Sequence, residues 1–289
     1  MTLGVGIHLD IPNADYHADP CERPSLSSSI AKILVTRTPL HAWEAHPRLG
    51  NIAERKGTDA TDRGEVIHGL VLGGGRDFVV VQADDWKTKA AREKRDEARA
   101  AGMVPLLEHV FIECSKAAEV IGRLIPKNIA REVTVVWESD GVLCRGRLDG
   151  WDGERSIILD LKNCDDANAS GSGTNHVRMG YDIQDAAYTE AMETVAPERA
   201  GRIVFQRIFA EVSGARVEKC KIVESSGSML ELGRQRWARA KRTWAACIAA
   251  NNWPGYPTEA VRVEAPAWSL AAELDAMAEM DMQHDGDAF

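Results

Sequence analysis

Several features that define particular protein classes are absent from this sequence of 289 residues. It contains no stretch of about 18 consecutive apolar residues, which excludes a transmembrane helix. The first residues lack a basic segment followed by an apolar stretch, so we do not expect a secretory signal peptide. We therefore predict a protein of the cytoplasm that has no membrane partner.

Cysteines at metal-binding spacings are also absent. The six cysteines stand at least 20 residues apart, so no C-x-x-C pair occurs. Such spacing matches neither a zinc ribbon nor an iron–sulfur site. In the cytoplasm we expect these thiols to stay reduced, mainly as small buried side chains.

An excess of positive charge is missing as well. The chain has 35 Lys and Arg residues against 44 Asp and Glu residues, a formal net charge of −9. This balance argues against a protein that coats nucleic acid without specificity. Residues 269–289 hold six acidic residues and no Lys or Arg, so the rest of the chain is near neutral and can contain a basic groove. We predict one domain over residues 1–268, with a helical N-terminal part, and a flexible acidic tail over residues 269–289.

Apolar periodicity and turn residues predict helices, then three strands, a helix, two strands and a last helix. Tight turns between the three strands indicate an antiparallel meander. The expected helices are 30–34, 63–72, 84–101, 105–125, 181–194 and 229–250. The expected strands are 78–81, 132–138, 142–151, 156–162, 202–211 and 216–223. The segment 163–175 is expected to be a flexible loop. This order predicts an α/β domain with a mixed central β-sheet flanked by helices.

The strongest chemical signal lies at the end of the third predicted strand, in Asp160-Leu161-Lys162. Side chains alternate along a strand, so Asp160 and Lys162 point to the same face. Asp149 ends the preceding strand, and a tight hairpin would set it beside Asp160. Two carboxylates and one ammonium group at a sheet edge suit a hard divalent cation such as Mg²⁺, with the lysine able to neutralise phosphoryl charge.

A structural interpretation of the same residues stays open. Asp and Lys on an exposed strand usually form a surface pair, and Asp149-Gly150 is a common turn dipeptide. However, Asp160 follows the apolar run 157–159, which is typical of a buried strand, and an acid at the end of such a strand needs a partner or a metal. The residues alone leave the two interpretations about equal.

Other candidate residues also have two interpretations. Gln184 and Tyr188 share one face of a predicted helix, where a tyrosine more often packs into the core. His68 stands four residues after Gly64 near the end of an early helix, and a lone helical histidine is more often structural. Glu132 could reach the metal edge, although an exposed glutamate at a strand end is the simpler expectation.

Taken in order, these motifs resemble those of the PD-(D/E)xK nuclease superfamily. They are G-x-x-x-H (Gly64 to His68), Asp149, D-x-K (Asp160 to Lys162) and Q-x-x-x-Y (Gln184 to Tyr188). Within the superfamily the chain is most similar to the exonuclease VIII (RecE-type) nucleases of phages and prophages. The serine-rich segment 27–29 and the T-P-L-H-A-W segment 38–43 are similar to that family too, and the resemblance spans about residues 20–250.

The resemblance implies a restriction-endonuclease-like core with a metal site. By resemblance, the metal ligands would be the side chains of His68, Asp149 and Asp160 and the backbone carbonyl of Leu161. Leu148 stands where the superfamily motif has a proline, which leaves the carboxylate of Asp149 in place.

The resemblance also gives roles to three further residues. Lys162 would position the attacking water or stabilise the phosphoryl charge. Gln184 and Tyr188 would shape the site and hold the DNA backbone.

The implied activity is Mg²⁺-dependent digestion of linear double-stranded DNA, with Mn²⁺ as a substitute metal and no iron–sulfur cluster. Digestion would run 5′ to 3′ and leave 3′ single strands for phage-type recombination. The implied partners are double-stranded DNA ends, a single-strand annealing protein and further copies in a homo-oligomer, in the bacterial host cytoplasm if the protein is phage-encoded. A structure-specific or endonucleolytic repair nuclease, or a catalytically silent DNA-binding scaffold, remain alternatives.

Phosphate contacts require basic side chains. The candidates are the segment 87–99 and the last helix, where Arg234, Arg236, Arg239, Lys241 and Arg242 lie, although both can be ordinary solvated faces. An apolar face for oligomerisation could come from Trp237, Trp244 and Trp253, with core packing the simpler expectation for two of them.

Overall fold

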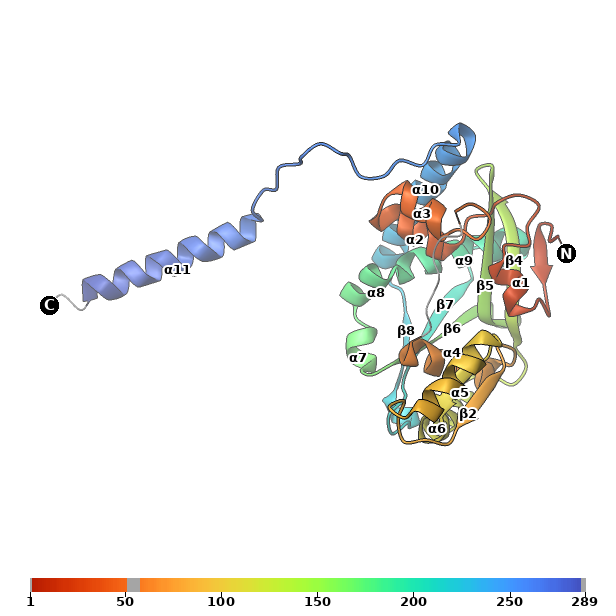
Figure 1. Cartoon of the computed structure of the whole chain (residues 1–289). Helices are drawn as coiled ribbons and strands as arrows, with labels where there is room; N and C mark the ends of the chain where they lie inside the picture. Colours follow the sequence, from red (N-terminus) through yellow and green to blue (C-terminus); the bar gives the residue numbers. More distant parts are fainter. Residues whose placement is uncertain (1, 51–57, 287–289) are drawn as a thin grey trace. The chain divides into compact units, whose positions relative to one another are not determined.

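A six-stranded β-sheet forms the centre of the unit that runs from Met1 to Gly255 (Figure 1). The computed structural model describes residues 2–50 and 58–286 of the chain. In spatial order the strands are β1 (Gly6–His8), β4 (Ala130–Ser139), β5 (Val142–Asp152), β6 (Ile157–Cys164), β7 (Val204–Glu211) and β8 (Cys220–Glu224). Neighbours are antiparallel except β6 and β7, which are parallel. The predicted mixed sheet and its antiparallel meander are confirmed.

Two large apolar cores lie against this sheet, each covered by its own helices, and a third, small core lies between the N-terminal segment and strands β4 and β5. The helices of the first core are α2 (Ser28–Thr36), α3 (Pro39–Ala45), α9 (Tyr181–Val195) and α10 (Gly227–Ala250), and those of the second are α4 (Asp59–Leu72) and α6 (Glu108–Gly122). Alternation along β6 sends Ile158 into the first core and Leu159 and Leu161 into the second. Asp160, between the two leucines, therefore points toward the α9 side.

A second, two-stranded sheet corrects one prediction. β2 (Phe78–Val81) pairs in parallel with β3 (Val104–Leu107), so the segment expected to begin a helix at 105 begins with a strand. All four residues of β3 are buried, and this continuous apolar run with a proline suits a strand better than an amphipathic helix. The connecting helix is α5 (Lys89–Ala100), and the helix expected over 105–125 is α6, which starts at Glu108.

The segment 163–175 is not the loop that its composition predicted. β6 continues to Cys164, and two short helices follow, α7 (Ala167–Ser170) and α8 (Gly173–Met179). Each begins at a polar cap. The carboxylate of Asp166 accepts hydrogen bonds from the amides of Asn168 and Ala169, and the hydroxyl of Ser172 accepts one from the amide of Asn175. The polar residues therefore start helices here.

The N-terminal segment adds two elements that the sequence did not predict. β1 extends the sheet along β4, and α1 (Asn13–His17) follows it. The salt-bridged carboxylate of Asp19, which is 2% exposed, accepts a hydrogen bond from the hydroxyl of Ser25 at 2.6 Å and lies 3.2 Å from the guanidinium of Arg145. These contacts fix the segment to β5.

The rest of the chain, Tyr256–Phe289, forms a separate unit. Its helix α11 (Ala267–Gly286) occupies much of the predicted acidic tail, so the described part of this tail is helical. The compact unit ends at Gly255, before the expected boundary at residue 268. The flexibility of the tail stays a prediction. Within the described residues, no helix combines the length and the apolarity that crossing a membrane requires.

The contact between α9 and α10 gives a test of this packing. A Cβ atom at Gly233 would lie 2.2 Å from the carbonyl oxygen of Asp182, so Gly233→Ala must push the two helices apart. We expect a loss of about 1–3 kcal/mol in the free energy of unfolding, measured by urea denaturation followed by circular dichroism. Gly122→Ala in α6 is the matched control, because no atom lies within 4 Å of its added Cβ. Equal urea midpoints for the two variants would contradict this packing.

Candidate catalytic and metal site

The site forms where strands β5 and β6 separate. Their regular pairing runs from Asp152–Ile157 to Gly150–Leu159. Beyond this pair, the partner of the Leu161 amide is a side chain of β5. The amide donates a hydrogen bond to the Asp149 carboxylate at 2.7 Å. The carboxylate of Asp149, which the sequence had already indicated, therefore bridges the two strands where their backbones separate.

Glu132 on β4 lies directly across from Asp149, between two regular cross-strand pairs. Its backbone φ of +52° is left-handed, a conformation that costs a non-glycine residue about 1–3 kcal/mol and is concentrated at functional sites. The side chain is 24% exposed, and the guanidinium of Arg147 lies 2.6 Å from its carboxylate. The expectation of an exposed strand-end glutamate is wrong, and Glu132 joins the site.

His68 reaches the same point from helix α4, which covers the second core. It lies on α4, which begins at a capping box formed by Thr58 and Thr61. Its Nδ1 is 3.7 Å from Asp149 Oδ2, and its Nε2 is 2.9 Å from the carbonyl oxygen of Leu161. The structure thus brings together three of the four predicted metal ligands, His68, Asp149 and the Leu161 carbonyl.

His68, Glu132 and Asp149 can offer one ligand atom each, all within 4.8 Å of one another. Burial raises the pKa of both carboxyls, and so does nearby negative charge, that of Asp160 for Asp149 and that of Asp149 for Glu132. A divalent cation would relieve this repulsion. Two carboxylates, an imidazole and a carbonyl suit Mg²⁺, and the imidazole also suits Mn²⁺. The residues present therefore fit the implied metal.

Asp160 occupies a different environment, although it is the neighbouring acid. Its Oδ1 accepts hydrogen bonds from Lys162 Nζ at 2.7 Å and Gln184 Nε2 at 2.8 Å, and its Oδ2 accepts one from Arg207 Nε at 2.8 Å. Burial would raise the pKa of this carboxyl, but the charges of Lys162 and Arg207 outweigh it and lower the pKa to about 2. Both oxygens already have cationic partners, so metal binding by Asp160 stays a prediction.

Arg207 is the central residue that sequence reasoning missed. It lies opposite Asp160 in the parallel pair of β6 and β7 and is 1% exposed. Besides Asp160 it binds Asp185 at 2.8 Å, and its guanidinium lies 4.3 Å from the centre of the Tyr181 ring. The sequence did indicate this role, because Arg207 stands inside the apolar strand 204–210. An arginine buried there must have acidic partners.

Lys162 is a cation in this environment. Burial lowers the pKa of its amine, but the charges of Asp160 and Asp149 raise it more, so the pKa is higher than usual. Its side chain is 26% exposed, and Nζ lies 5.8 Å from the centre of the Tyr181 ring. The lysine therefore offers positive charge and N–H donors at the opening of the site and cannot take up a proton.

Gln184 and Tyr188 lie in different surroundings, although they share a helix face. Gln184 reaches Asp160, whereas Tyr188 is 6% exposed within the first core. The tyrosine ring packs on Gly146, where a Cβ atom would lie 2.7 Å from it. This packing agrees with the core interpretation of Tyr188, and its contact with DNA stays a prediction.

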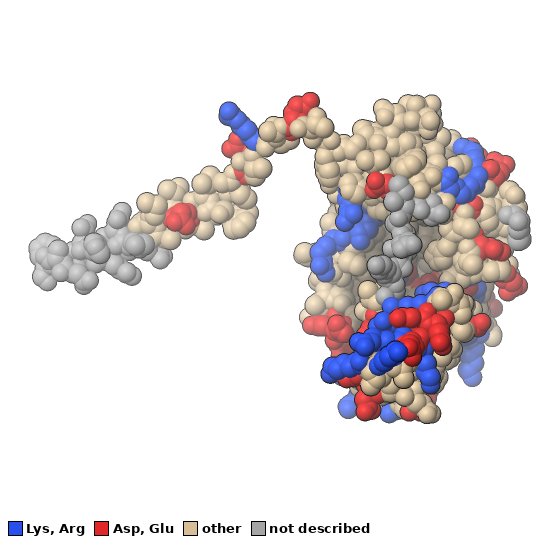
Figure 2. Space-filling view, viewed as in Figure 1, with Lys and Arg blue, Asp and Glu red and all other residues tan. Residues whose placement is uncertain are grey.

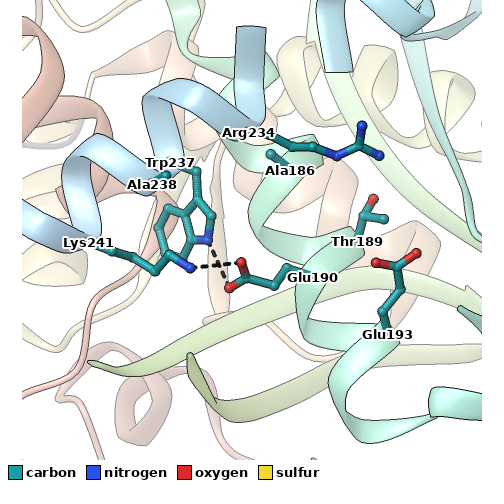
Figure 3. A pocket seen from close by; sticks show the side chains of 8 residues that line it. All are labelled: Ala186, Thr189, Glu190, Glu193, Arg234, Trp237, Ala238 and Lys241. Atoms are coloured by element: carbon teal, nitrogen blue, oxygen red, sulfur yellow. Dashed lines mark hydrogen bonds and ion pairs between the residues drawn. The ribbon is translucent and has the colours of Figure 1, made fainter. Parts of the chain in front are cut away.

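Arg234 lies at a cavity between α9 and α10 with a volume of about 260 Å³ (Figure 3). Figure 3 shows Trp237 and Lys241 both bonded to Glu190, whose carboxylate is 2.9 Å from Lys241 Nζ. Lys241 is 4% exposed and fully engaged, so it is not a phosphate contact in this conformation. None of the predicted catalytic side chains lines this cavity, and DNA binding by Arg234 stays a prediction.

The remaining surface predictions have mixed outcomes. Trp237 and Trp244 are both 2% exposed, which confirms core packing for two of the three tryptophans. Over the α5 region, Lys and Arg are interspersed with Asp and Glu (Figure 2). Arg95 pairs with Asp96 and Lys89 with Glu93. This mixture favours an ordinary solvated face for the segment 87–99.

Comparisons with known proteins agree with this architecture. Residues 29–264 match the family described as "PDDEXK-like domain of unknown function (DUF3799)". The crystal structure of a "Putative exonuclease" from Eubacterium rectale superposes with a TM-score of 0.61 at 13% identity, covering 92% of this chain and 99% of that one. The structure of a phage related exonuclease from Haemophilus somnus 129PT gives a TM-score of 0.34 at 13% identity, covering 68% and 85%. At these identities the likeness concerns the fold alone. A search of curated proteins gave no match.

The ion pairs of Asp160 make a testable contribution to stability. We expect Asp160→Asn to lower the free energy of unfolding near neutral pH by about 3–5 kcal/mol, because it leaves the buried Arg207 without a full partner. A carboxyl whose pKa falls on folding, here from 3.8 to about 2, stabilises the fold above the ordinary value and loses that effect as the pH drops toward 2. The difference between wild type and variant should therefore shrink below about pH 4.

Urea unfolding of both proteins at several pH values measures this difference. Asp96→Asn, on the exposed face of α5, is the matched control and should change stability by less than about 0.5 kcal/mol at every pH. A wild-type advantage that stays constant from pH 7 to pH 3 would mean that the Asp160 ion pairs do not form.

Proposed function

Because the chain belongs to the family of PDDEXK-like domains of unknown function (DUF3799), we propose that it is a metal-dependent deoxyribonuclease. The single observation that carries the proposal is the cluster of His68, Glu132 and Asp149 donor atoms within 4.8 Å, beside the D-x-K strand that holds Lys162. Three metal-binding groups and a fixed ammonium at one end of a sheet suit phosphodiester hydrolysis.

Different residues of the chain would have different roles in that reaction. His68, Glu132, Asp149 and the carbonyl of Leu161 would hold Mg²⁺, with Mn²⁺ as a substitute. A divalent cation here supplies Lewis-acid stabilisation of phosphoryl charge and a more acidic water.

Lys162 places a positive charge next to this cluster. Its ammonium is anchored by Asp160, so it is already oriented toward a phosphate or an attacking water when the substrate arrives. Gln184 and Arg207 hold Asp160 in turn. These contacts fix the lysine without placing Gln184 or Arg207 on the substrate.

The proposed substrate is linear double-stranded DNA, digested from its ends. The sequence resemblance to RecE-type nucleases supports a 5′-to-3′ exonuclease that leaves 3′ single strands for recombination. The name of the Eubacterium rectale protein, aligned over 99% of its length, is in line with exonucleolytic action. A single-strand annealing protein and a homo-oligomer belong to this proposal on the resemblance alone.

The test uses linear duplex labelled at the 5′ or the 3′ ends, together with closed plasmid circles, in Mg²⁺, Mn²⁺ or Ca²⁺. We expect loss of the 5′ label first in Mg²⁺ or Mn²⁺, intact circles, and no turnover in Ca²⁺. Lys162→Ala should lower the rate by about 10²–10³-fold, because it removes a preorganised charge at the phosphate. Lys162 is the cleaner position to replace, since changing Asp160 also removes one of the two acidic partners of the buried Arg207.

Lys94→Ala, an exposed lysine on α5, is the control and should digest linear DNA at the wild-type rate. Cleavage of circles would favour an endonuclease of the same fold. Wild-type protein that binds duplex but leaves both labels intact would favour a silent DNA-binding scaffold. Full activity of the folded Lys162→Ala variant would remove the proposed mechanism.

A further inference from the structure

Three basic side chains from three different helices meet at the junction between α8 and α9. The aliphatic part of Lys32, on α2, covers Gly180, where a Cβ atom would lie 2.9 Å from Lys32 Cγ. Arg236, on α10, donates a hydrogen bond to the carbonyl of Val177 at 3.3 Å. Arg178 lies within the junction itself. The cluster is therefore built by tertiary packing and is not a run of basic residues in the sequence.

The positive charge of this cluster is only partly balanced. Arg236 lies 2.7 Å from the buried carboxylate of Asp182. In the part of the chain that the structure describes, Lys32 and Arg178 form no ion pair, and the guanidinium of Arg178 contacts only the neutral amide oxygen of Asn175 at 2.8 Å. Burial lowers the pKa of Lys32, and the charges of Arg178, Arg236 and Arg37 lower it further. Cations that repel one another here would be stabilised by an anion.

The cluster adjoins the proposed catalytic residues through the first turn of α9. That helix begins at Tyr181, whose ring lies 5.8 Å from Lys162 Nζ, and its next turn carries Gln184, which binds Asp160. The positive end of the α9 dipole points toward the same junction. Tyr181, beside Lys162, and Gly180, under Lys32, are neighbours in the chain, so the two groups of basic side chains meet at the start of α9.

We propose that Lys32 and Arg178, positioned with Arg236, form a phosphate-binding site for the DNA backbone outside the catalytic centre. This inference rests on the proposed nuclease function, because a phosphate held here continues the strand that lies at Lys162. The site holds substrate and does not take part in bond cleavage. Its contribution is therefore to affinity and not to the chemical step.

The experiment measures binding of a fluorescent duplex to the full-length protein by anisotropy, without divalent metal, over a range of salt concentrations. Lys32→Gln/Arg178→Gln is compared with Arg92→Gln/Lys94→Gln, a double variant that removes one lysine and one arginine from the exposed face of α5. We expect the first variant to weaken binding at least tenfold at low salt. The slope of log K against log salt should fall by about 1.8, since each lost phosphate contact contributes about 0.9. The α5 variant should bind as wild type does.

Further measurements distinguish phosphate binding by these residues from a purely structural or catalytic role. Lys32→Arg/Arg178→Lys should restore binding, and thermal unfolding should show that all variants are folded. Under catalytic conditions the Gln variant should raise KM and leave kcat and the affinity for Mn²⁺ unchanged. Inorganic phosphate should compete only weakly, because a single ion lacks the rest of the strand.

Unchanged affinity and slope in the folded Gln variant would overturn the inference, and so would loss of binding in the α5 variant alone. A fall in kcat at saturating DNA would also overturn it, because it would place these residues in the chemical step. If wild-type protein binds duplex through this cluster but hydrolyses nothing, the nuclease proposal fails while the phosphate site stands.

Discussion

The buried carboxylate of Asp160 is the group on which the rest of the site depends. It receives hydrogen bonds from three elements, through Lys162 on its own strand, Arg207 on β7 and Gln184 on α9. A buried charge is tolerated only when such partners surround it. The same contacts orient Lys162 and fix the first turns of α9 against the sheet. The need of the buried Asp160 charge for partners therefore links the geometry of the site to the packing of the domain.

The two aspartates of the motif have opposite environments, although they stand on neighbouring strands. Asp160 is surrounded by cations of the protein, which depress its pKa. Asp149 lies beside Glu132 and has a raised pKa, first because it is buried and then because of the negative charge of Asp160. Side chains of the protein therefore neutralise the charge of Asp160, whereas Asp149 lies in a cluster whose negative charge an added cation would neutralise. That cluster lies where β5 separates from β6.

Local patterns in the sequence were sufficient for the strands that carry the motif and for the helix that carries Gln184. Alternation places Asp160 and Lys162 together, and this depends only on neighbours in the chain. Glu132 was misjudged because its left-handed backbone, which no local pattern indicates, turns it toward Asp149. Arg207 was missed because its partner lies across a parallel pair whose register is set by tertiary packing. In the same way, Tyr188 and Gln184 share a helix face, but only the packed sheet shows that one lies in the core and the other at the site.

The position of the metal tests the central claim most directly. Crystals of the full chain soaked in Mn²⁺ and measured at a wavelength where manganese scatters anomalously should show one strong peak within bonding distance of His68, Glu132 and Asp149, with Lys162 Nζ facing the ion across the opening of the site. A peak bound only to surface carboxylates, or no peak among these three side chains in crystals that contain Mn²⁺, would contradict the account.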